Sequence, residues 1–258
     1  MGEIFDALRK ALDTKEPVGL VTEVQGPNPG AKMLVGEESV LGSLGDEGLD
    51  GAVIENARGM IEMSQTGTRT YGPQGQGNSE EVEVFIQAFS QPPDMYVLGA
   101  VNLASAVVHL GKYLGYKVTL VDARKVFANR DRYPEADEVI VQWPNEFLET
   151  APISKRTAIV ILTHDPKFDI PILEFALKSP VGYLGAMGSR RTHEKRKANL
   201  REVGITDEEI ARVHAPLGVD IGARTPEETA VSIMAQIIAL RSGRSGGHLD
   251  QAAGRIHA

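Results

Sequence analysis

Hydrophobic and polar positions along the first ninety residues predict a mixture of helices and strands. Apolar side chains recur at helical spacing over Glu3–Leu12 and again over Gly51–Ser64, which predicts two amphipathic helices. Three segments have the pattern of strands, namely Val18–Val24, Ala31–Val35 and Glu81–Phe89. The stretch Tyr71–Ser79 is rich in glycine and predicts a loop. We therefore expect residues 1–90 to form a small α+β domain.

After residue 94, short apolar strands alternate regularly with helices. Met95–Leu98, Asn102–Leu114 and Lys117–Val121 predict a strand, a helix and a second strand. Further strands are expected at Glu138–Val141, Ala158–Leu162 and Val181–Leu184, and further helices at Phe168–Lys178, Ser189–Val203 and, after capping boxes, from Thr206 and from Thr225 to about Arg241. The pattern predicts an α/β fold, with a Rossmann-like parallel-sheet domain over residues 94–242. Residues 243–258 are expected to form a flexible C-terminal tail.

Composition narrows the classes of protein that the chain can belong to. It has 258 residues, a net charge of −8 and no cysteine, which excludes disulfides, thiolate metal sites, iron–sulfur clusters and a cysteine nucleophile. The longest apolar runs are too short for a membrane helix, so we expect a cytoplasmic protein without membrane insertion. Aromatic residues make up 5% and the chain is acidic, so nucleic acid is an unexpected partner.

The first two candidate sites follow the first two strands of the predicted parallel sheet, where such sheets bind ligands. Gly99, Asn102 and Ala104 belong to a turn in the position of a glycine-rich dinucleotide fingerprint, although Val101 replaces its middle glycine. Asp122 lies 23 residues after Gly99 and could accept hydrogen bonds from ribose hydroxyls, and Arg124 is a further candidate for cofactor binding. The alternatives are ordinary helix–strand packing at the turn and an aspartate that only caps the next turn.

Three more candidate sites follow later strands. His164 and Asp165 could transfer a proton or bind a ligand, or could be a solvated histidine beside a turn-capping aspartate. An anion site is predicted where a serine N-cap begins a basic helix, at Gly185, Gly188, Ser189 and Arg190. A second potential anion site contains Asp220 and Arg224, where tight-turn packing is the alternative. No spacing of His, Asp and Glu predicts a metal site, and catalytic residues stay unassigned.

Three longer motifs resemble those of the xanthine dehydrogenase accessory factor family, XdhC/CoxI. They are ILTHDPKFD at Ile161–Asp169, YLGAMGSRRTH at Tyr183–His193 and GVDIGARTPEETAVSI at Gly218–Ile233. The motifs occur in the family's order and spacing. Weaker similarity extends through PGAKMLV at Pro29–Val35 and across the N-terminal domain, so the resemblance covers most of the chain.

The resemblance implies an accessory or chaperone protein, usually a homodimer, rather than a catalyst. Such a protein would bind molybdenum cofactor, as molybdopterin or its dinucleotide form, assist its sulfuration and deliver it to the apo-enzyme of a molybdenum hydroxylase such as xanthine or carbon monoxide dehydrogenase. A cysteine desulfurase is a further partner that the family role suggests. Under this hypothesis Gly185, Gly188, Ser189 and Arg190 bind the phosphate and Arg224 adds positive charge. Asp122 then orients hydroxyls, and His164 with Asp165 contacts the pterin or transfers a proton.

The chain departs from the family pattern in two places. The family sequence V-G-S-I-S-G-G-C-V-E-G-A-V matches Leu41–Val53 without gaps, which puts Gly48 at the cysteine and Asp50 at the glutamate. The family turn G-A-G-H-V corresponds to Gly99–Leu103, which lacks one glycine and the histidine. With no cysteine, the chain cannot hold cofactor or sulfur through its own thiolate.

Two other functions stay open at the level of sequence. An oxidoreductase could bind NAD(P) at the turn after Gly99 and use His164 as an acid, although no hydride-transfer constellation is identifiable. An interaction protein that has lost its ligand site would also fit the altered turn and the absent cysteine. The exact ligand, the recipient enzyme and the oligomeric state are not determined by sequence.

Overall fold

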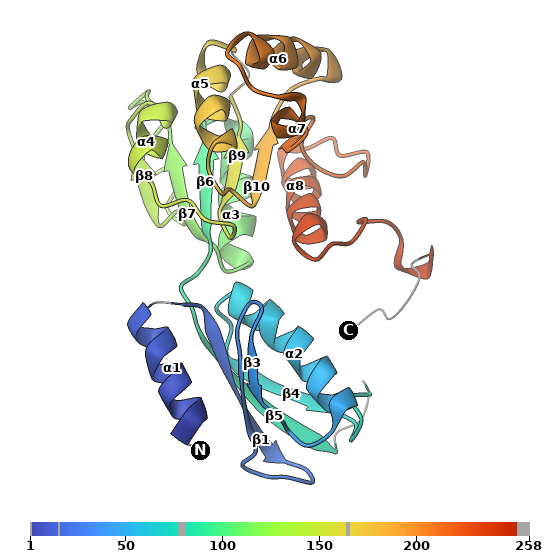
Figure 1. Cartoon of the computed structure of the whole chain (residues 1–258). Helices are drawn as coiled ribbons and strands as arrows, with labels where there is room; N and C mark the ends of the chain where they lie inside the picture. The colour runs from blue at the N-terminus through green and yellow to red at the C-terminus, as the bar shows by residue number, and fades with distance from the viewer. Residues whose placement is uncertain (1, 15, 77–80, 164–165, 252–258) are drawn as a thin grey trace. The chain divides into compact units, whose positions relative to one another are not determined.

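The computed structural model describes residues 2–14, 16–76, 81–163 and 166–251, and the chain divides into two compact units. One unit comprises residues up to Pro92 together with His248–Gln251, and the other comprises Pro93–Gly247 (Figure 1). Among the described residues, no helix is long and apolar enough to span a membrane. The predicted tail at 243–258 is described only to residue 251, and its remainder lies outside the described residues.

The first unit is a five-stranded antiparallel sheet with one helix on each face. Its elements are α1 (Gly2–Thr14), β1 (Val18–Gln25), β2 (Lys32–Val35), β3 (Val40–Gly42), α2 (Glu47–Glu62), β4 (Gly67–Tyr71) and β5 (Val82–Phe89), and the strand order is β3-β2-β1-β5-β4. Alternate residues of β1 face opposite helices, since Val21 packs in the core under α2 and Val18 packs against α1.

Two short strands and the start of α2 differ from the sequence prediction. The strand β3 has only three residues, Val40–Gly42, and β4 is mostly exposed and polar, so neither shows the alternation that identifies a half-buried strand. The helix begins at Glu47 instead of Gly51, because Asp46 caps it by accepting the backbone N–H groups of Gly48 and Leu49. The predicted loop from Tyr71 to Ser79 lies partly outside the described residues.

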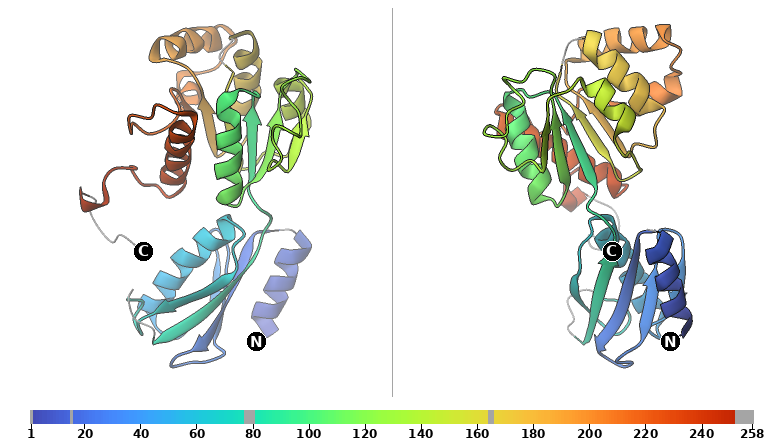
Figure 2. Two further views of the ribbon diagram at one scale, coloured as in Figure 1. Left: turned by 180° about the vertical axis from the view of Figure 1, so that it is seen from behind. Right: turned by 90° about the vertical axis from the view of Figure 1, so that its left-hand side faces the viewer.

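The second unit is a six-stranded parallel sheet with helices on both faces, which confirms the predicted fold class. Its elements are β6 (Asp94–Leu98), α3 (Asn102–Tyr113), β7 (Lys117–Val121), β8 (Glu138–Ile140), α4 (Pro144–Thr150), β9 (Ala158–Ile161), α5 (Pro166–Leu177), β10 (Tyr183–Ala186), α6 (Arg190–Glu202), α7 (Asp207–Ile210), β11 (Val213–His214) and α8 (Pro226–Arg241). A short 3₁₀ helix, η1 (Leu249–Gln251), follows α8 along the chain and belongs to the first unit. The helices α3 and α8 pack together on one face, and α4 and α5 pack on the other (Figure 2).

The strand order β11-β10-β9-β6-β7-β8 is that of a doubly wound dinucleotide-binding fold. Starting from the central strand β6, the chain first builds the sheet outward through β7 and β8. It then returns to the other side of β6 with β9 and continues outward through β10 and β11. The order therefore reverses between β6 and β9, and a crevice forms at the carboxyl ends of these two strands.

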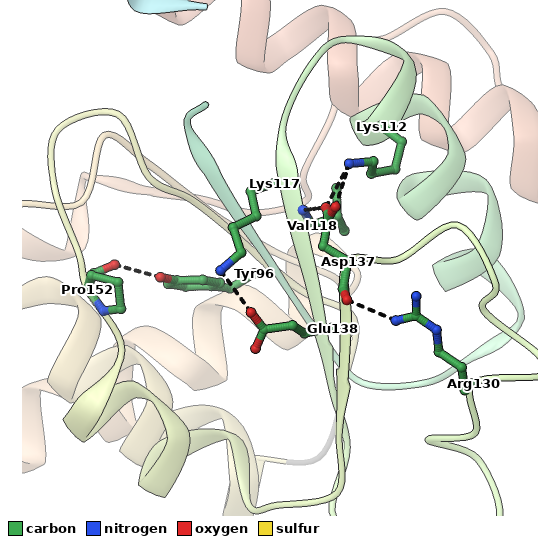
Figure 3. A network of polar contacts seen from close by, with 8 residues as sticks. All are labelled: Tyr96, Lys112, Lys117, Val118, Arg130, Asp137, Glu138 and Pro152. Atoms are coloured by element: carbon green, nitrogen blue, oxygen red, sulfur yellow. Dashed lines mark hydrogen bonds and ion pairs between the residues drawn. The ribbon is translucent and has the colours of Figure 1, made fainter. Parts of the chain in front are cut away.

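A network of polar contacts fixes the opposite, amino-terminal edge of this sheet (Figure 3). The Asp137 carboxylate accepts hydrogen bonds from Lys112 Nζ, at 2.8 Å to each oxygen, and from the backbone N–H of Val118 at 2.7 Å. Next to it, Lys117 pairs with Glu138 at 2.8 Å. Burial alone would raise the pKa of Asp137, but the Lys112 ammonium and the Val118 N–H outweigh it and hold that pKa below its usual value. The network joins the beginnings of β7 and β8 to the end of α3.

We expect Asp137→Asn to reduce stability in a pH-dependent way. The folded-state pKa is lowered, so the charge stabilises the fold above the unfolded-state pKa of about 3.9 and this contribution disappears as pH falls through the folded-state pKa. Since both side chains are about one third exposed, the loss at pH 7 should be about 0.5–1 kcal/mol, measured by urea unfolding. Adding Lys112→Gln to this variant should lower the free energy of unfolding only slightly further. A loss that stayed constant down to about pH 3 would contradict this role of the charge.

Candidate functional site

A pocket of about 260 Å³ lies at the carboxyl edge of the parallel sheet, where the strand order reverses. Its walls come from the segments that follow four strands and from the first turn of α5. The lining residues are Gly99, Val101, Asp122, Ala123, Arg124, Trp143, Pro144, Thr163 and Phe168. Three of the residues predicted from the sequence, Gly99, Asp122 and Arg124, are therefore brought together there. Asn102 and Ala104 occupy the first turn of the adjoining α3, the former exposed and the latter buried.

The turn between β6 and α3 lines this pocket, which we call the switch-point pocket because the strand order reverses there. Gly99 has a φ of +114°, and a β-carbon at this position would lie 3.0 Å from Cγ2 and 3.1 Å from the backbone nitrogen of Thr163. Only glycine allows both this backbone conformation and this close approach to the end of β9. Val101 is the N-cap of α3 and offers no side-chain hydrogen bond, so the first backbone N–H groups of the helix lack a side-chain cap.

Asp122 and Arg124 form a direct ion pair on one wall of the pocket. The buried Asp122 carboxylate accepts hydrogen bonds from the backbone N–H groups of Ala100 and Arg124, and from Nε and Nη2 of the Arg124 guanidinium, at 2.7–2.9 Å. Burial would raise the pKa of Asp122, but these four donors outweigh it and lower that pKa. Because a carboxylate has about four lone-pair positions, a ribose hydroxyl would have to displace Arg124 to reach it.

Arg124 itself extends toward solvent and places positive charge beside the pocket. Its side chain is 54% exposed although it pairs with Asp122. Its guanidinium carbon lies 4.3 Å from the centroid of the Phe127 ring, a cation–π contact that holds the group over the loop after β7. The wall therefore presents a fixed guanidinium to any ligand in the pocket.

Two aromatic residues that the sequence did not single out form another wall. Trp143 is the N-cap of α4 and Phe168 lies in the first turn of α5. Their rings stack with centroids 5.1 Å apart and an angle of 20° between their planes. The available signal was the position of Trp143 directly before the proline that begins α4, two residues past a strand-like segment.

Behind the pocket, a buried ion pair connects the end of β9 to α5 and α6. The Thr163 hydroxyl donates to Asp169 Oδ1 at 2.5 Å, and Arg196 Nη2 donates to Asp169 Oδ2 at 2.6 Å and to the carbonyl of Met187 at 2.9 Å. The side chains of Arg196 and Asp169 are 2% and 1% exposed. Sequence reasoning missed this pair because a basic helix predicts a solvated face, whereas Arg196 turns inward.

The predicted anion site at the start of α6 lies at the end of β10, and its members differ in burial. Ser189 caps the helix by accepting the backbone N–H of Thr192, and Gly188 has a φ of +141°. Arg190 is exposed and forms no hydrogen bond or ion pair with the described residues. Gly185 is buried within β10, where a β-carbon would meet the Tyr183 ring, so packing alone accounts for this glycine.

Two buried polar atoms of α6 lie near this turn. Among the described residues, Nη1 of Arg196 and Nδ1 of His193 are buried and unpaired. Burial lowers the pKa of His193, and the neighbouring Arg196 and Lys197 charges lower it further. His193 is therefore neutral at pH 7.

The remaining predicted residues lie apart from the pocket or outside the described part. Asp220 and Arg224 are exposed on the loop between β11 and α8, where the Arg224 backbone N–H donates to Glu228 in the helix cap. His164 and Asp165 lie outside the described residues. In the part of the chain that is described, no three His, Asp or Glu side chains gather as a metal site would require.

Gly48, where the resemblance of the sequence motif places a cysteine, has no room for a side chain in this chain. A β-carbon at Gly48 would lie 2.7 Å from the carbonyl oxygen of Gln74, and one at Gly75 would contact the carbonyl oxygen of Gly48. The backbone of residues 72–76 thus packs directly on the first turn of α2, in the space that a side chain would need.

Two family models match the chain over most of its length. A model described as the XdhC Rossmann domain matches residues 95–237, and a model described as the XdhC and CoxI family matches residues 6–72. The chain therefore belongs to the XdhC and CoxI family, which confirms the resemblance found in the motifs.

The similar proteins include both unassigned and named relatives. The chain is 27% identical over 233 residues to the uncharacterized protein YqeB of Escherichia coli K12, covering 86% of this chain and 42% of that protein. It is 26% identical over 162 residues to a Bacillus subtilis protein named as a probable xanthine dehydrogenase component, covering 63% and 47%. Over 92 residues it is 37% identical to the molybdenum cofactor insertion chaperone PaoD of Escherichia coli K12, covering 36% and 29%. The matches thus span less than half the length of each relative.

A solved structure supports the fold of the whole chain. A crystal structure described as a xanthine dehydrogenase from Bacillus halodurans matches 97% of this chain and 98% of its own, with a TM-score of 0.55 and 19% identity. At this identity the match shows the shared fold.

We expect Arg196→Met to destabilise the protein strongly, because it leaves the Asp169 carboxylate buried without its cation. The free energy of unfolding should fall by about 3–5 kcal/mol, measured by urea denaturation. The double variant Asp169→Leu/Arg196→Met removes both charges and should recover more than half of that loss. A single-variant loss below about 1 kcal/mol would show that the pair is not desolvated as described.

Proposed function

We propose that the chain is a cytoplasmic accessory protein that binds molybdenum cofactor and assists maturation of a molybdenum hydroxylase, such as xanthine or carbon monoxide dehydrogenase. The observation that carries this proposal is the switch-point pocket, which combines the stacked Trp143 and Phe168 rings with the Arg124 guanidinium. The relative named as a molybdenum cofactor insertion chaperone supports the choice of cargo.

The chemistry of the pocket fits a phosphate-bearing pterin. The pyrimidine portion of a pterin is flat and conjugated, and aromatic walls bind such rings by stacking. A phosphate, or the pyrophosphate of the dinucleotide form, needs positive charge and backbone N–H donors. Arg124 offers positive charge at the wall of the same pocket. The cofactor is cargo here, and the protein's task is to bind it, to exclude water from it and to release it.

The turn at the start of α6 is our proposed second contact for the phosphate. The carboxyl ends of β6 and β10 are two strand spacings apart in the sheet, roughly 10 Å. A ligand whose ring occupies the pocket could extend across β9 toward Gly188, Ser189 and Arg190. The exposed Arg190 guanidinium is unpaired among the described residues, so it could form a charge-assisted contact without breaking another one. Arg224, also exposed, would add positive charge.

Sulfur transfer would require a partner. The chain has no thiol, so any sulfuration of the cofactor would use a separate cysteine desulfurase while the cargo stays in the pocket. His164 and Asp165 are the residues that we propose to contact the pterin or transfer a proton. The recipient would be the apo-enzyme of the hydroxylase.

The strand order favours one alternative, an NAD(P)-dependent oxidoreductase, since dinucleotides bind at the same crevice. Two features of the site weigh against it. Val101 occupies the position of the middle glycine that lets a pyrophosphate approach, and the Asp122 carboxylate already accepts four hydrogen bonds. A third function, interaction with a hydroxylase without any small ligand, remains as an outcome of the test below.

Ligand binding should raise the melting temperature of the purified protein. We expect a shift with molybdenum cofactor or its cytosine dinucleotide form, because binding to the folded state alone adds about 2.7 kcal/mol of stability at a hundredfold excess over Kd. NAD and NADP, added separately, should give none. A shift with NAD or NADP alone would replace the proposal by the oxidoreductase, and no shift with any of them would favour the interaction protein. Native mass spectrometry of the same samples reads the stoichiometry and tests the proposed homodimer.

Arg190→Ala should weaken cofactor binding by more than a factor of ten, because a charge-assisted contact contributes roughly 1.5–3 kcal/mol. Titration calorimetry measures the change. Lys195→Ala is the matched control, since it removes one positive charge from the exposed face of the same helix. Unchanged affinity in Arg190→Ala, or an equal loss in Lys195→Ala, would remove Arg190 from the site.

A further inference from the structure

We propose that the ring system of the cargo stacks on the Trp143 indole in the switch-point pocket. An N–H group on the edge of that ring donates a hydrogen bond to Thr163 Oγ1. This inference rests on the proposed function and deepens it. It assigns the recognition of the ring to two residues, and it places the phosphate-bearing tail outside the pocket.

The size of the pocket limits what it can enclose. Its volume of about 260 Å³ lies below the roughly 300–1,000 Å³ of sites that enclose a whole drug-sized ligand. A bicyclic ring is much smaller than a dinucleotide and is the portion that this space admits. The remainder of the cargo would lie along the surface, past Arg124 or toward the start of α6.

Trp143 offers the surface on which such a ring would stack. One side of its indole contacts Phe168 in a nearly parallel arrangement, and the residue remains 45% exposed while it lines the pocket. The indole thus keeps free area beside the cavity, and Phe168 holds it in place. A large exposed aromatic side chain with a fixed orientation can bind a ring at little cost in conformational entropy.

Thr163 determines which edge of the ring is recognised. Its hydroxyl proton is committed to Asp169 Oδ1, and the other oxygen of Asp169 is held by Arg196. The hydroxyl therefore has only lone pairs left for the pocket that it lines. A ligand must offer a donor at this point, as the amino and ring N–H groups of a pterin do. Asp169 and Arg196 act through Thr163 and are positioning residues.

Tryptophan fluorescence can test this geometry, because Trp143 is the only tryptophan in the chain. A conjugated ring stacked on the indole quenches its fluorescence, whereas a ligand bound elsewhere leaves the emission nearly unchanged. We would titrate the full chain with molybdenum cofactor and, separately, with 6-carboxypterin and inorganic phosphate. Free tryptophan titrated in parallel corrects for light absorbed by the ligands.

We expect cofactor and 6-carboxypterin to quench more than half of the emission at saturation and phosphate to quench none. Trp143→Ala should weaken binding about tenfold or more by thermal shift, and Trp143→Phe should stay within threefold of the parent. Thr163→Val, which removes the acceptor at nearly constant shape, should weaken binding about tenfold, and Thr163→Ser should restore it. The melting temperature of each variant without ligand verifies that it folds.

The outcomes separate this inference from the proposed function. A thermal shift with cofactor, combined with unquenched tryptophan and parental affinity in Trp143→Ala and Thr163→Val, would overturn the inference and leave the accessory role standing. Equal weakening in Thr163→Val and Thr163→Ser would overturn the hydrogen bond. A missing thermal shift with every molybdenum form would overturn both.

Discussion

The reversal of strand order between β6 and β9 is the constraint on which the rest of the second unit depends. Because the segments that leave these two neighbouring strands turn to opposite faces of the sheet, neither one covers the gap between the strand ends. Gly99 brings the first of these turns within contact of Thr163, so the gap narrows to a pocket of defined walls. The side chains that reach the pocket then determine its chemistry: a guanidinium on one wall, two stacked rings on another, and a hydroxyl whose proton points away.

Sequence alone predicted the fold because the strands of a parallel sheet are apolar throughout and their helices begin at recognisable caps. The helix capping boxes that begin at Thr206 and Thr225 form as expected, and Glu209 and Glu228 complete them. Gly99, Asp122 and Arg124 were found because they follow predicted strands. Trp143 and Phe168 were not found, and Thr163 was placed after a strand but given no role, because their meeting depends on how separate turns fold over one edge of the sheet. The inward rotation of Arg196 was also hidden, since five other basic residues share its helix.

Two kinds of ion pair in the second unit have different consequences for ligand binding. The Asp169–Arg196 pair is fully buried and holds the Thr163 hydroxyl in a fixed orientation. In the Asp122–Arg124 pair the carboxylate is buried and the guanidinium is half exposed, so the guanidinium can contact both its own carboxylate and an incoming anion. The first pair therefore fixes the geometry of the pocket, and the second supplies charge that a ligand can share.

The contact between Gly48 and the backbone at Gln74 has an evolutionary consequence. The two backbones touch here, because a β-carbon at Gly48 would lie 2.7 Å from the carbonyl oxygen of Gln74 and one at Gly75 would contact the carbonyl oxygen of Gly48. A single codon change to cysteine would clash with the chain before it could provide a thiol. A thiol at this position would therefore also require a compensating change in the loop, so it cannot arise by one substitution alone.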